Sequence, residues 1–441
     1  MTAKVDASAS MGPFQEFFRT EAATGALLVF CAATALGIAN SPWAGAYHRL
    51  WTTPIAVVSG GHPLSLTLHQ WINDGLMAVF FLLVGLEIKR EVLAGELASP
   101  RQAALPIAAA IGGMIVPAAI YVLANGGGIA ARGWAIPMAT DIAFALGALS
   151  LVAPRAPSGL KVFLAALAIV DDMGAVLVIA LFYTGDIAWR AMGMAGVILS
   201  ALIALNMLGV RRLTPYLVLG VGLWFSVHAS GVHATIAGVL LALTIPTRTR
   251  INAPEFSLRA RGLLEQFDRT ETGDSLVLTS KGQQEAIVEL ERASELVTAP
   301  LIRLEHALHG FSAYVVMPLF ALSNAGVSLT ESAGGRVTLA VVLGLVVGKP
   351  LGITAAALAA VRVRIAALPE GVSWTALHGC AWLGGIGFTM SLFIATLAFH
   401  GTSVLDSAKM GILSGSVVAG VVGAVLVRRG TRATRRNLGA P

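Results

Sequence analysis

The sequence predicts an all-α polytopic membrane protein, and three observations lead to this fold class. Of its 441 residues, 56% are hydrophobic and only 12% are charged, whereas soluble domains carry about 25% charged residues. Its apolar stretches are close to the ~20 residues that a helix needs to cross a bilayer. Its Lys and Arg residues gather in alternate connections between these stretches, as expected for cytoplasmic loops.

Twelve transmembrane helices are expected. Their predicted ranges are 22–40, 69–88, 103–124, 133–152, 161–184, 191–209, 214–229, 232–246, 304–327, 336–360, 374–399 and 407–427. The seventh and eighth ranges could instead form one long span. Arg211 and Arg212 precede this region, and Arg248 and Arg250 follow it. Both of its ends are therefore predicted to be cytoplasmic, which requires two crossings with a break near residues 230–231.

The distribution of basic residues predicts the topology. With twelve spans, the inner segments hold 24 of the 30 Lys and Arg residues, the outer connections hold five, and Lys349 lies within the tenth span. Both termini are therefore predicted to be cytoplasmic. The net charge of +6 is spread through short connections, so no nucleic-acid partner is expected. Cys31 and Cys380 both lie in apolar spans, where they are expected to be small buried hydrophobes without a disulfide framework.

Two segments outside the spans carry their own patterns. The stretch "IAVVSGGHPLSLTLH" has a Gly-Gly pair between β-branched and alternating residues, which predicts a small outer β-hairpin. Such a hairpin could pair with its copy across a two-fold axis, which suggests a possible homodimer. The cytoplasmic insert 247–303 is polar and charged, and its "KGQQEAIVELERASELV" is predicted to be helical. The insert is interpreted as a solvated segment, with a regulatory role as the alternative.

Four charged residues are predicted to lie deep in the membrane: Asp141, Asp171, Asp172 and Lys349. A charge at the bilayer centre costs about 2.5–3.5 kcal/mol on insertion scales. One structural explanation is that these residues simply pair with one another, but one Lys leaves acids over. Surplus carboxylates at this depth usually mark an ion or proton path. Adjacent helical residues point about 100° apart, so one of Asp171 and Asp172 is expected to line the ion cavity and the other to meet Lys349. A further acid, Asp74, lies near the start of the second span.

Two of the predicted spans are interrupted. The fourth contains Pro137 shortly before Thr140 and Asp141, and the eleventh contains "LGGIGF" in its middle. A proline inside a helix removes a hydrogen bond and kinks or breaks the helix. Close helix packing is an alternative explanation for the glycines. However, both interrupted spans are central members of three-span groups, 103–184 and 336–427, that begin on opposite sides of the membrane. Interrupted helices in corresponding halves indicate a transporter with inverted repeats, here as one domain over 1–441.

The motifs also resemble those of a known family. The stretches "NDGLMAVFFLLVGLEIKRE", "ATDIAFALG", "ALAIVDDMGA", "SGVHATIAG", "GKPLGI" and "GIGFTMSLF" are similar to signatures of NhaA-type sodium/proton antiporters. They occur in the family order between roughly residue 15 and residue 425. The resemblance implies that the fourth and eleventh spans cross as broken helices, a repeat architecture for which this family is a known example. The insert 247–303 is longer than expected for the family, which weakens the transfer of pH regulation.

The resemblance also implies roles for individual residues. Asp172 would be the principal sodium and proton site, with Asp171, Asp141 and Thr140 as its neighbours. Asp141 would offset the positive ends of the half-helices, and Lys349 would balance their negative ends and pair with Asp171. The implied pH-sensing candidates are Glu87, Arg90, Glu91, His233, Glu305, His306 and His309. A packing role for His233 and a mere surface pair for Glu87 and Arg90 are the alternatives.

Together with the buried charges, this resemblance implies an electrogenic antiporter of a bacterial inner membrane, a secondary transporter rather than an enzyme. It would extrude sodium, and lithium with it, in exchange for protons, and would serve pH and sodium homeostasis. No cofactor is expected beyond the transported ions, which prefer oxygen ligands. A sodium-coupled symporter, an ion channel and a membrane scaffold are rival interpretations. A symporter should show more polar groups or an Arg in its cavity. A channel does not need a pair of repeats for alternating access, and a scaffold leaves the buried charges unexplained.

Overall fold

The structure is a computed structural model that describes residues 13–59, 62–269, 280–329 and 335–437. It is mostly helical, with one two-stranded sheet. The elements of the first half of the chain are α1 (Pro13–Ala39), α2 (Ala44–Thr52), β1 (Pro54–Ser59), β2 (His62–Thr67), α3 (Leu68–Gln70), η1 (Trp71–Leu76), α4 (Met77–Ala94), η2 (Glu96–Ala98), α5 (Pro100–Asn125), η3 (Ile129–Met138), α6 (Ile142–Val152), α7 (Ser158–Phe182), α8 (Trp189–Met207), α9 (Leu213–Ala229) and α10 (Ile236–Thr244).

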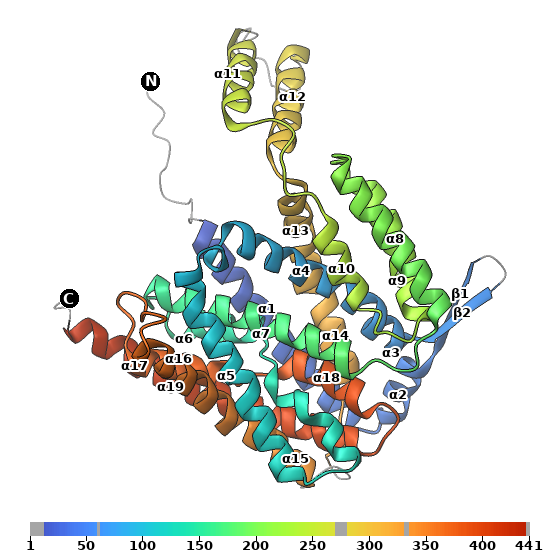
Figure 1. Cartoon of the computed structure of the whole chain (residues 1–441), viewed down its shortest axis with the longest axis vertical. Coiled ribbons are helices and arrows are strands. Elements are labelled where there is room, and N and C mark those ends of the chain that lie inside the picture. The colour runs from blue at the N-terminus through green and yellow to red at the C-terminus, as the bar shows by residue number, and fades with distance from the viewer. Residues whose placement is uncertain (1–12, 60–61, 270–279, 330–334, 438–441) are drawn as a thin grey trace.

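The second half contains two helices of the predicted insert and a second set of apolar helices (Figure 1). Its elements are α11 (Ala253–Arg269), α12 (Lys281–Val297), α13 (Pro300–Phe311), η5 (Ser312–Val316), α14 (Met317–Asn324), α15 (Arg336–Leu343), η6 (Gly344–Gly348), α16 (Lys349–Arg362), α17 (Trp374–Leu383), α18 (Phe388–Phe399) and α19 (Val404–Asn437).

Several helices are suited to a membrane by length and composition. Within the described residues, six are long and apolar enough to span it alone, and three bent pairs pass the same test together. Two of the bent pairs, η3 with α6 and α17 with α18, fall where the sequence predicts interrupted spans. The third is α1 with α2, bent by 113°, which the sequence did not predict. The protein is therefore an integral membrane protein with interrupted helices, while the count of twelve spans stays a prediction.

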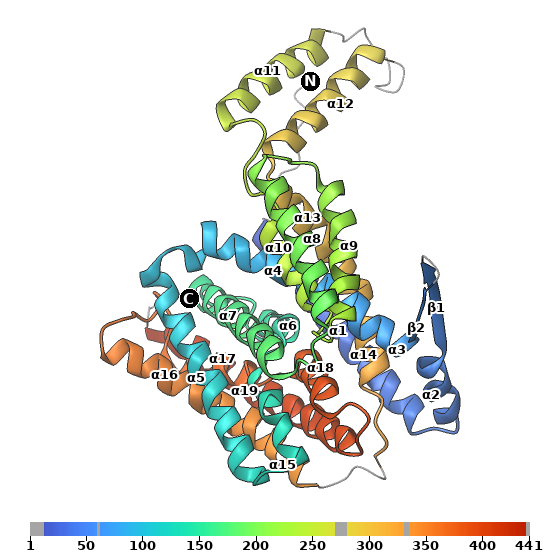
Figure 2. The same ribbon diagram turned by 45° about the vertical axis from the view of Figure 1, so that its right-hand side comes forward.

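The helices around the interruptions occur as two similar sets. In the first, the interrupted pair η3 and α6 lies between the long helices α5 and α7, and in the second, α17 and α18 lie between α16 and α19. Helices α5 and α16 pack side by side (Figures 1 and 2). They cross at Gly112 and Gly352, where a Cβ on either residue would lie within 2.3 Å of the other's carbonyl oxygen. Glycine at both positions allows this close approach.

The hairpin and the insert both extend from the helical body. Strands β1 and β2 pair antiparallel from Pro54 opposite Thr67 to Ser59 opposite His62, at the place where the sequence predicts a hairpin. Helices α11 and α12 pack against each other and stand apart from the other helices at the top of Figures 1 and 2. Helix α12 covers the whole segment predicted to be helical in the insert. The break predicted near residues 230–231 separates α9 from α10.

Candidate ion-binding site

The two interrupted helices meet at their breaks. The chain bends by 41° between η3 and α6 and by 44° between α17 and α18. The Thr140 hydroxyl donates to the Gly384 carbonyl oxygen at 2.7 Å, and the Asp141 amide donates to the Ile386 carbonyl oxygen at 2.7 Å. Backbone groups that leave a helix inside a membrane must find other partners. Here, each break supplies such partners for the other.

The local sequence explains why both helices break. Pro137 lacks an amide hydrogen, and Ala139 after it is extended, with φ −86° and ψ 146°. At the other break, glycine is required by close packing. A Cβ at Gly385 would lie 2.5 Å from the Leu345 carbonyl oxygen, and one at Gly387 would lie 2.1 Å from the Ser391 Oγ atom. The glycines therefore let the second break approach its neighbours closely.

Asp141 joins the amino-terminal ends of both half-helices. Its Oδ1 atom accepts a hydrogen bond from the Phe144 amide at 3.1 Å, in the first turn of α6. Its Oδ2 atom accepts from the Thr389 amide at 3.1 Å, in the first turn of α18, and from the Thr389 hydroxyl. Helix amino termini carry partial positive charge and favour anions. The carboxylate is thus placed between two positive helix ends, and Asp141 is 1% exposed to solvent.

Lys349 and Asp171 form a buried ion pair. The Lys349 Nζ atom, in the first residue of α16, lies 2.5 Å from the Asp171 Oδ2 atom of α7. Both side chains are 1% exposed. Removing two charges from water is costly, so such a pair depends on good geometry and on both partners being present. Thr140, at the break of the first interrupted helix, is a further polar neighbour of Asp171.

Asp172 differs from Asp171 in its surroundings. It is 2% exposed, and its charged neighbours are mostly acids: Asp171, Asp141 and Glu87, with Lys349 as the basic one. Among the described residues, the Oδ1 atoms of Asp171 and Asp172 are buried without a hydrogen-bond partner. Burial and nearby negative charge favour the neutral, protonated form of a carboxyl group. Buried oxygens without a partner are also suitable ligands for a hard cation.

The polar atoms of the site are mostly oxygens. Within the described part of the chain, no group of three or more His, Cys, Asp or Glu side chains is arranged to hold a metal ion. The oxygens belong to the buried carboxylates, to the hydroxyls of Thr140 and Thr389, and to the backbone carbonyls of Gly384 and Ile386 at the second break.

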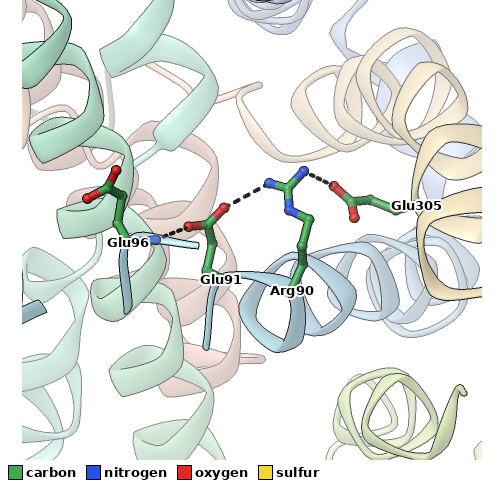
Figure 3. A network of polar contacts seen from close by, with 4 residues as sticks. All are labelled: Arg90, Glu91, Glu96 and Glu305. Atoms are coloured by element: carbon green, nitrogen blue, oxygen red, sulfur yellow. Dashed lines mark hydrogen bonds and ion pairs between the residues drawn. The ribbon is translucent and has the colours of Figure 1, made fainter. Parts of the chain in front are cut away.

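A second charged network contains three of the proposed pH-sensing residues (Figure 3). The Arg90 guanidinium lies 2.8 Å from the Glu305 Oε1 atom and 3.1 Å from the Glu91 Oε1 atom. Glu91 also accepts a hydrogen bond from the Glu96 amide at 3.1 Å. These contacts join α4 to α13 and to the η2 turn. Arg90 therefore connects two helices, whereas the alternative left open by the sequence was a surface pair with Glu87 within one helix.

The other pH-sensing candidates lie around or outside this network. His306 and His309 follow Glu305 on α13. Glu87 lies one turn before Arg90 on α4 and is close enough to Asp172 for the negative charges of the two carboxylates to repel each other. His233 lies in the connection between α9 and α10, which is not among the elements that the network joins. The structure therefore brings together Arg90, Glu91 and Glu305, and places His233 elsewhere.

Three hydroxyl residues of the site were missed by sequence reasoning. Thr389 bonds to Asp141, the Ser391 hydroxyl donates to the Ile136 carbonyl oxygen at 2.7 Å, and the Ser416 hydroxyl accepts from the Phe388 amide at 3.2 Å. Thr389 and Ser391 stand within the first turn after the glycine break, "GFTMS". Hydroxyl side chains at the start of a half-helix are a signal that could have identified them. Ser416 gave no such signal, because it is one serine within a long apolar helix.

Ionisable residues buried where two interrupted membrane helices cross define a secondary active transporter. The sequence model of the family described as Na+/H+ antiporter 1 matches residues 15–427. A protein named Na(+)/H(+) antiporter NhaA from Oleidesulfovibrio alaskensis is 51% identical over 95% of this chain and 94% of its own length. Proteins of the same name from Koribacter versatilis and Wolinella succinogenes are 49% and 48% identical, and the alignments cover 95% and 92% of this chain and 92% and 91% of theirs. The chain belongs to the Na+/H+ antiporter 1 family.

Proposed function

We propose that this protein is an electrogenic antiporter that extrudes sodium, and lithium with it, in exchange for protons. The observation that carries the proposal is the group of buried carboxylates at the helix crossing. Asp172 and Asp171 each have an oxygen without a hydrogen-bond partner, and within the described residues the ion pair with Lys349 is made by Asp171 and not by Asp172. Three relatives of similar length carry the name Na(+)/H(+) antiporter, which supports the same reaction.

The chemistry of exchange follows from competition for the same oxygens. When Asp172 holds a proton, its carboxyl group is neutral and has little attraction for sodium. When sodium binds, it favours the ionised carboxylate, and the proton leaves to the side of the membrane that the site faces. Thr140 and the freed backbone carbonyls are proposed as further ligands, because alkali cations prefer neutral and anionic oxygens. Protons and sodium then replace each other at a single site.

Coupling requires that the empty, ionised site does not reorient. An uncompensated buried charge costs several kcal/mol, because breaking a buried ion pair costs about 3–5 kcal/mol. Lys349 neutralises Asp171, and Asp141 offsets the positive ends of α6 and α18. The charge that remains is therefore on Asp172, and either a proton or sodium removes it. Exchange on Asp172 alone moves one proton for each sodium ion and no net charge, so electrogenic exchange needs a second proton in each cycle; we propose that Asp171 carries it, by leaving its ion pair with Lys349 when it takes up a proton.

The architecture supports alternating access. Residues 103–184 and 336–427 are proposed as inverted repeats, and the crossing of α5 with α16 at Gly112 and Gly352 joins them. We infer that both termini and the insert 247–303 are cytoplasmic, in a bacterial inner membrane, with the β1–β2 hairpin outside. The basic residues of the predicted inner segments support this orientation. A homodimer through the hairpin is proposed from its exposed position (Figure 2).

A role in pH regulation is proposed for the network of Arg90, Glu91 and Glu305, together with Glu87, His306, His309 and His233. The network connects α4, which also carries Glu87 near Asp172, to α13, which follows the insert. A change of charge on α13 could therefore alter how α4 packs against the site. This path of contacts is the reason for the assignment.

The Asp172→Asn variant tests the proposed function. In everted membrane vesicles, a sodium pulse should release protons in the wild type, and the variant should lose this response because the amide cannot bind and release a proton. Asp186→Asn is the matched control, since Asp186 is an exposed acid in the connection after α7. It should keep wild-type exchange. A membrane-potential dye in the same vesicles tests whether the exchange moves net charge.

Two results would contradict the proposal. If Asp172→Asn inserted normally and kept wild-type sodium-driven proton release, Asp172 would not be the exchange site. If the wild type moved sodium with no proton flux at any pH, the protein would be a channel or a symporter instead.

A further inference from the structure

The short helix α2, outside the ion-binding site, has a direction suited to the membrane surface. The first predicted span, 22–40, coincides with the greater part of α1, and the chain then turns by 113° into α2. Because α1 runs across the membrane, a turn close to a right angle directs α2 along the surface. Helix α2 has nine residues, and at about 1.5 Å per residue it is too short to cross a bilayer. Figure 2 shows it at the edge of the molecule, next to the hairpin.

One side of α2 is fixed to the body of the protein. Tyr47 is buried, and its hydroxyl donates to the Leu322 carbonyl oxygen of α14 at 2.6 Å. Trp51 lies one turn later, with its ring edge to face with that of Tyr47 and the centroids 5.8 Å apart. In the turn before α2, the Asn40 amide donates to the Val327 carbonyl oxygen at 2.7 Å. These contacts fix the rotation of α2 about its own axis, and with it the direction of its other sides.

A second side of α2 is apolar and exposed. Trp43, which precedes the helix, is 72% exposed, and Leu50 is 52% exposed. Ala46 lies between them and is also exposed. Spacings of three and four residues place the three side chains in one row along the helix. The large exposed side chains of α1 are likewise apolar, namely Val29, Phe30 and Ile38. The row therefore lies next to a surface that faces lipid.

The remaining side of α2 is polar and basic. At about 100° per residue, the exposed His48 and Thr52 lie about 160° from Leu50, and the exposed Arg49 lies between them and the apolar row. The helix contains no Asp or Glu. A helix with an apolar face and a basic polar face lies in the interface between water and lipid. Trp is enriched at the same depth, and Arg is complementary to phosphate groups.

The exposed row is too small for a second copy of the chain to be its partner. An aromatic side chain buries about 150–250 Å², and Leu50 and Ala46 add less. The total is well below the ~800 Å² that each partner buries in a stable protein interface. Lipid needs no such area, because it already surrounds the neighbouring helix α1.

We propose that α2 is an interfacial helix that binds the lipids of the outer leaflet of the bilayer. Trp43, Ala46 and Leu50 lie among the acyl chains, Arg49 lies at the phosphate groups, and His48 faces water. Because α2 leads directly into β1, this contact holds the base of the hairpin at the membrane surface. The inference goes beyond sodium/proton exchange, and the side of the membrane follows from the orientation proposed above.

The test measures which medium the exposed row faces. Cys31 and Cys380 are replaced by Ala, and a nitroxide label is attached to Leu50→Cys in the full-length protein in phosphatidylcholine–phosphatidylglycerol vesicles. Collisions of the label with oxygen, which concentrates in lipid, are compared with collisions with a water-soluble nickel chelate. Gly45→Cys is the matched control, since Gly45 is exposed, has room for a side chain, and lies about 140° from Leu50. The oxygen-to-nickel ratio should be at least about threefold higher at residue 50 than at residue 45.

Ala46→Cys, in the same row, covers the case in which a label at residue 50 prevents folding, and gel filtration shows which labelled proteins are folded. The proposal is overturned if labels in the row collide as often with the nickel chelate as the label at residue 45 does. It is also overturned if the row is closed to both reagents and the spectra broaden between two copies, because a second copy would then cover it. None of these readings depends on exchange, so a failure of the proposed function would be seen separately, in the vesicle assay of Asp172→Asn and the wild type.

Discussion

Replacing Lys349 by Met should destabilise the protein in a pH-dependent way. The ammonium group lies 2.5 Å from the Asp171 Oδ2 atom, and both side chains are 1% exposed. Methionine has a similar length and fits an apolar site, so the change removes the charge with little change in volume. It leaves Asp171 as a buried carboxylate without its cation, among the acids Asp141 and Asp172.

The size of the effect follows from the choice left to Asp171. The group can stay ionised and unpaired, which costs about 3–5 kcal/mol when a buried pair is broken. Alternatively, it can take up a proton. A carboxyl group in water has a pKa of about 3.9, and each pH unit corresponds to about 1.36 kcal/mol, so protonation at pH 7 costs about 4 kcal/mol. Both estimates give a loss of about 4 kcal/mol in the free energy of unfolding.

The sign of the pH dependence is fixed by the proton. In the variant, the folded state binds one more proton than the unfolded state, so its stability falls as pH rises, by up to about 1.4 kcal/mol per unit. The assay is thermal unfolding of the purified protein in detergent at about pH 6 and about pH 8. The deficit relative to the wild type should be smaller at the lower pH. Adding Asp171→Asn to Lys349→Met should recover most of the loss, because neither charge is then left unpaired.

The reasoning is refuted if Lys349→Met is as stable as the wild type at both pH values. It is also refuted if the double variant is less stable than Lys349→Met, because the unpaired carboxylate would then not be the cause.

Two further substitutions separate the contributions of hydrogen bonds and of partly exposed charges. Thr389→Val removes the hydroxyl that donates to Asp141 and should cost about 1.5–3 kcal/mol of unfolding free energy, as for hydrogen bonds to charged groups. Thr389→Ser keeps a hydroxyl and should restore the stability. Equal losses in both variants would show that the hydroxyl is not the cause. Arg90→Gln removes the partner of Glu305, but the Arg90 side chain is 40% exposed, so water and salt screen the pair. Its destabilisation should be smaller than that of Lys349→Met and should shrink at high salt, and a loss of equal size would show that screening is overestimated.

The sequence predicted the parts of the fold that depend on local chemistry. Pro137 and the glycines of "LGGIGF" indicated the two breaks, and the aspartates in an apolar run indicated a buried site. Both features are local, because a missing amide hydrogen or an unusual charge is visible in the residue itself. The resemblance to a family then indicated which positions share one site, and Lys349 does pair with Asp171.

The remaining features depend on packing that the sequence does not show. From the residues alone, Lys349 could have met either Asp171 or Asp172, because the choice depends on the rotation of α7 relative to α16. That rotation depends on the arrangement of α5 and its neighbours, including the close crossing at Gly112 and Gly352. The double role of Asp141 at two helix ends depends likewise on where α6 and α18 meet. The 113° turn between α1 and α2 had no recognised signal in the sequence.

The central claim is that sodium and protons replace each other on the buried carboxylates, and proton release on sodium binding measures this directly. Purified protein in weakly buffered detergent solution is mixed with sodium chloride, with choline chloride as the salt control, while the pH of the solution is followed. The account predicts release of protons on sodium addition and no release from Asp172→Asn. It also predicts that the apparent sodium affinity falls by up to about tenfold for each unit by which the pH is lowered, for each proton displaced. Sodium binding with no proton release over the whole pH range would contradict it.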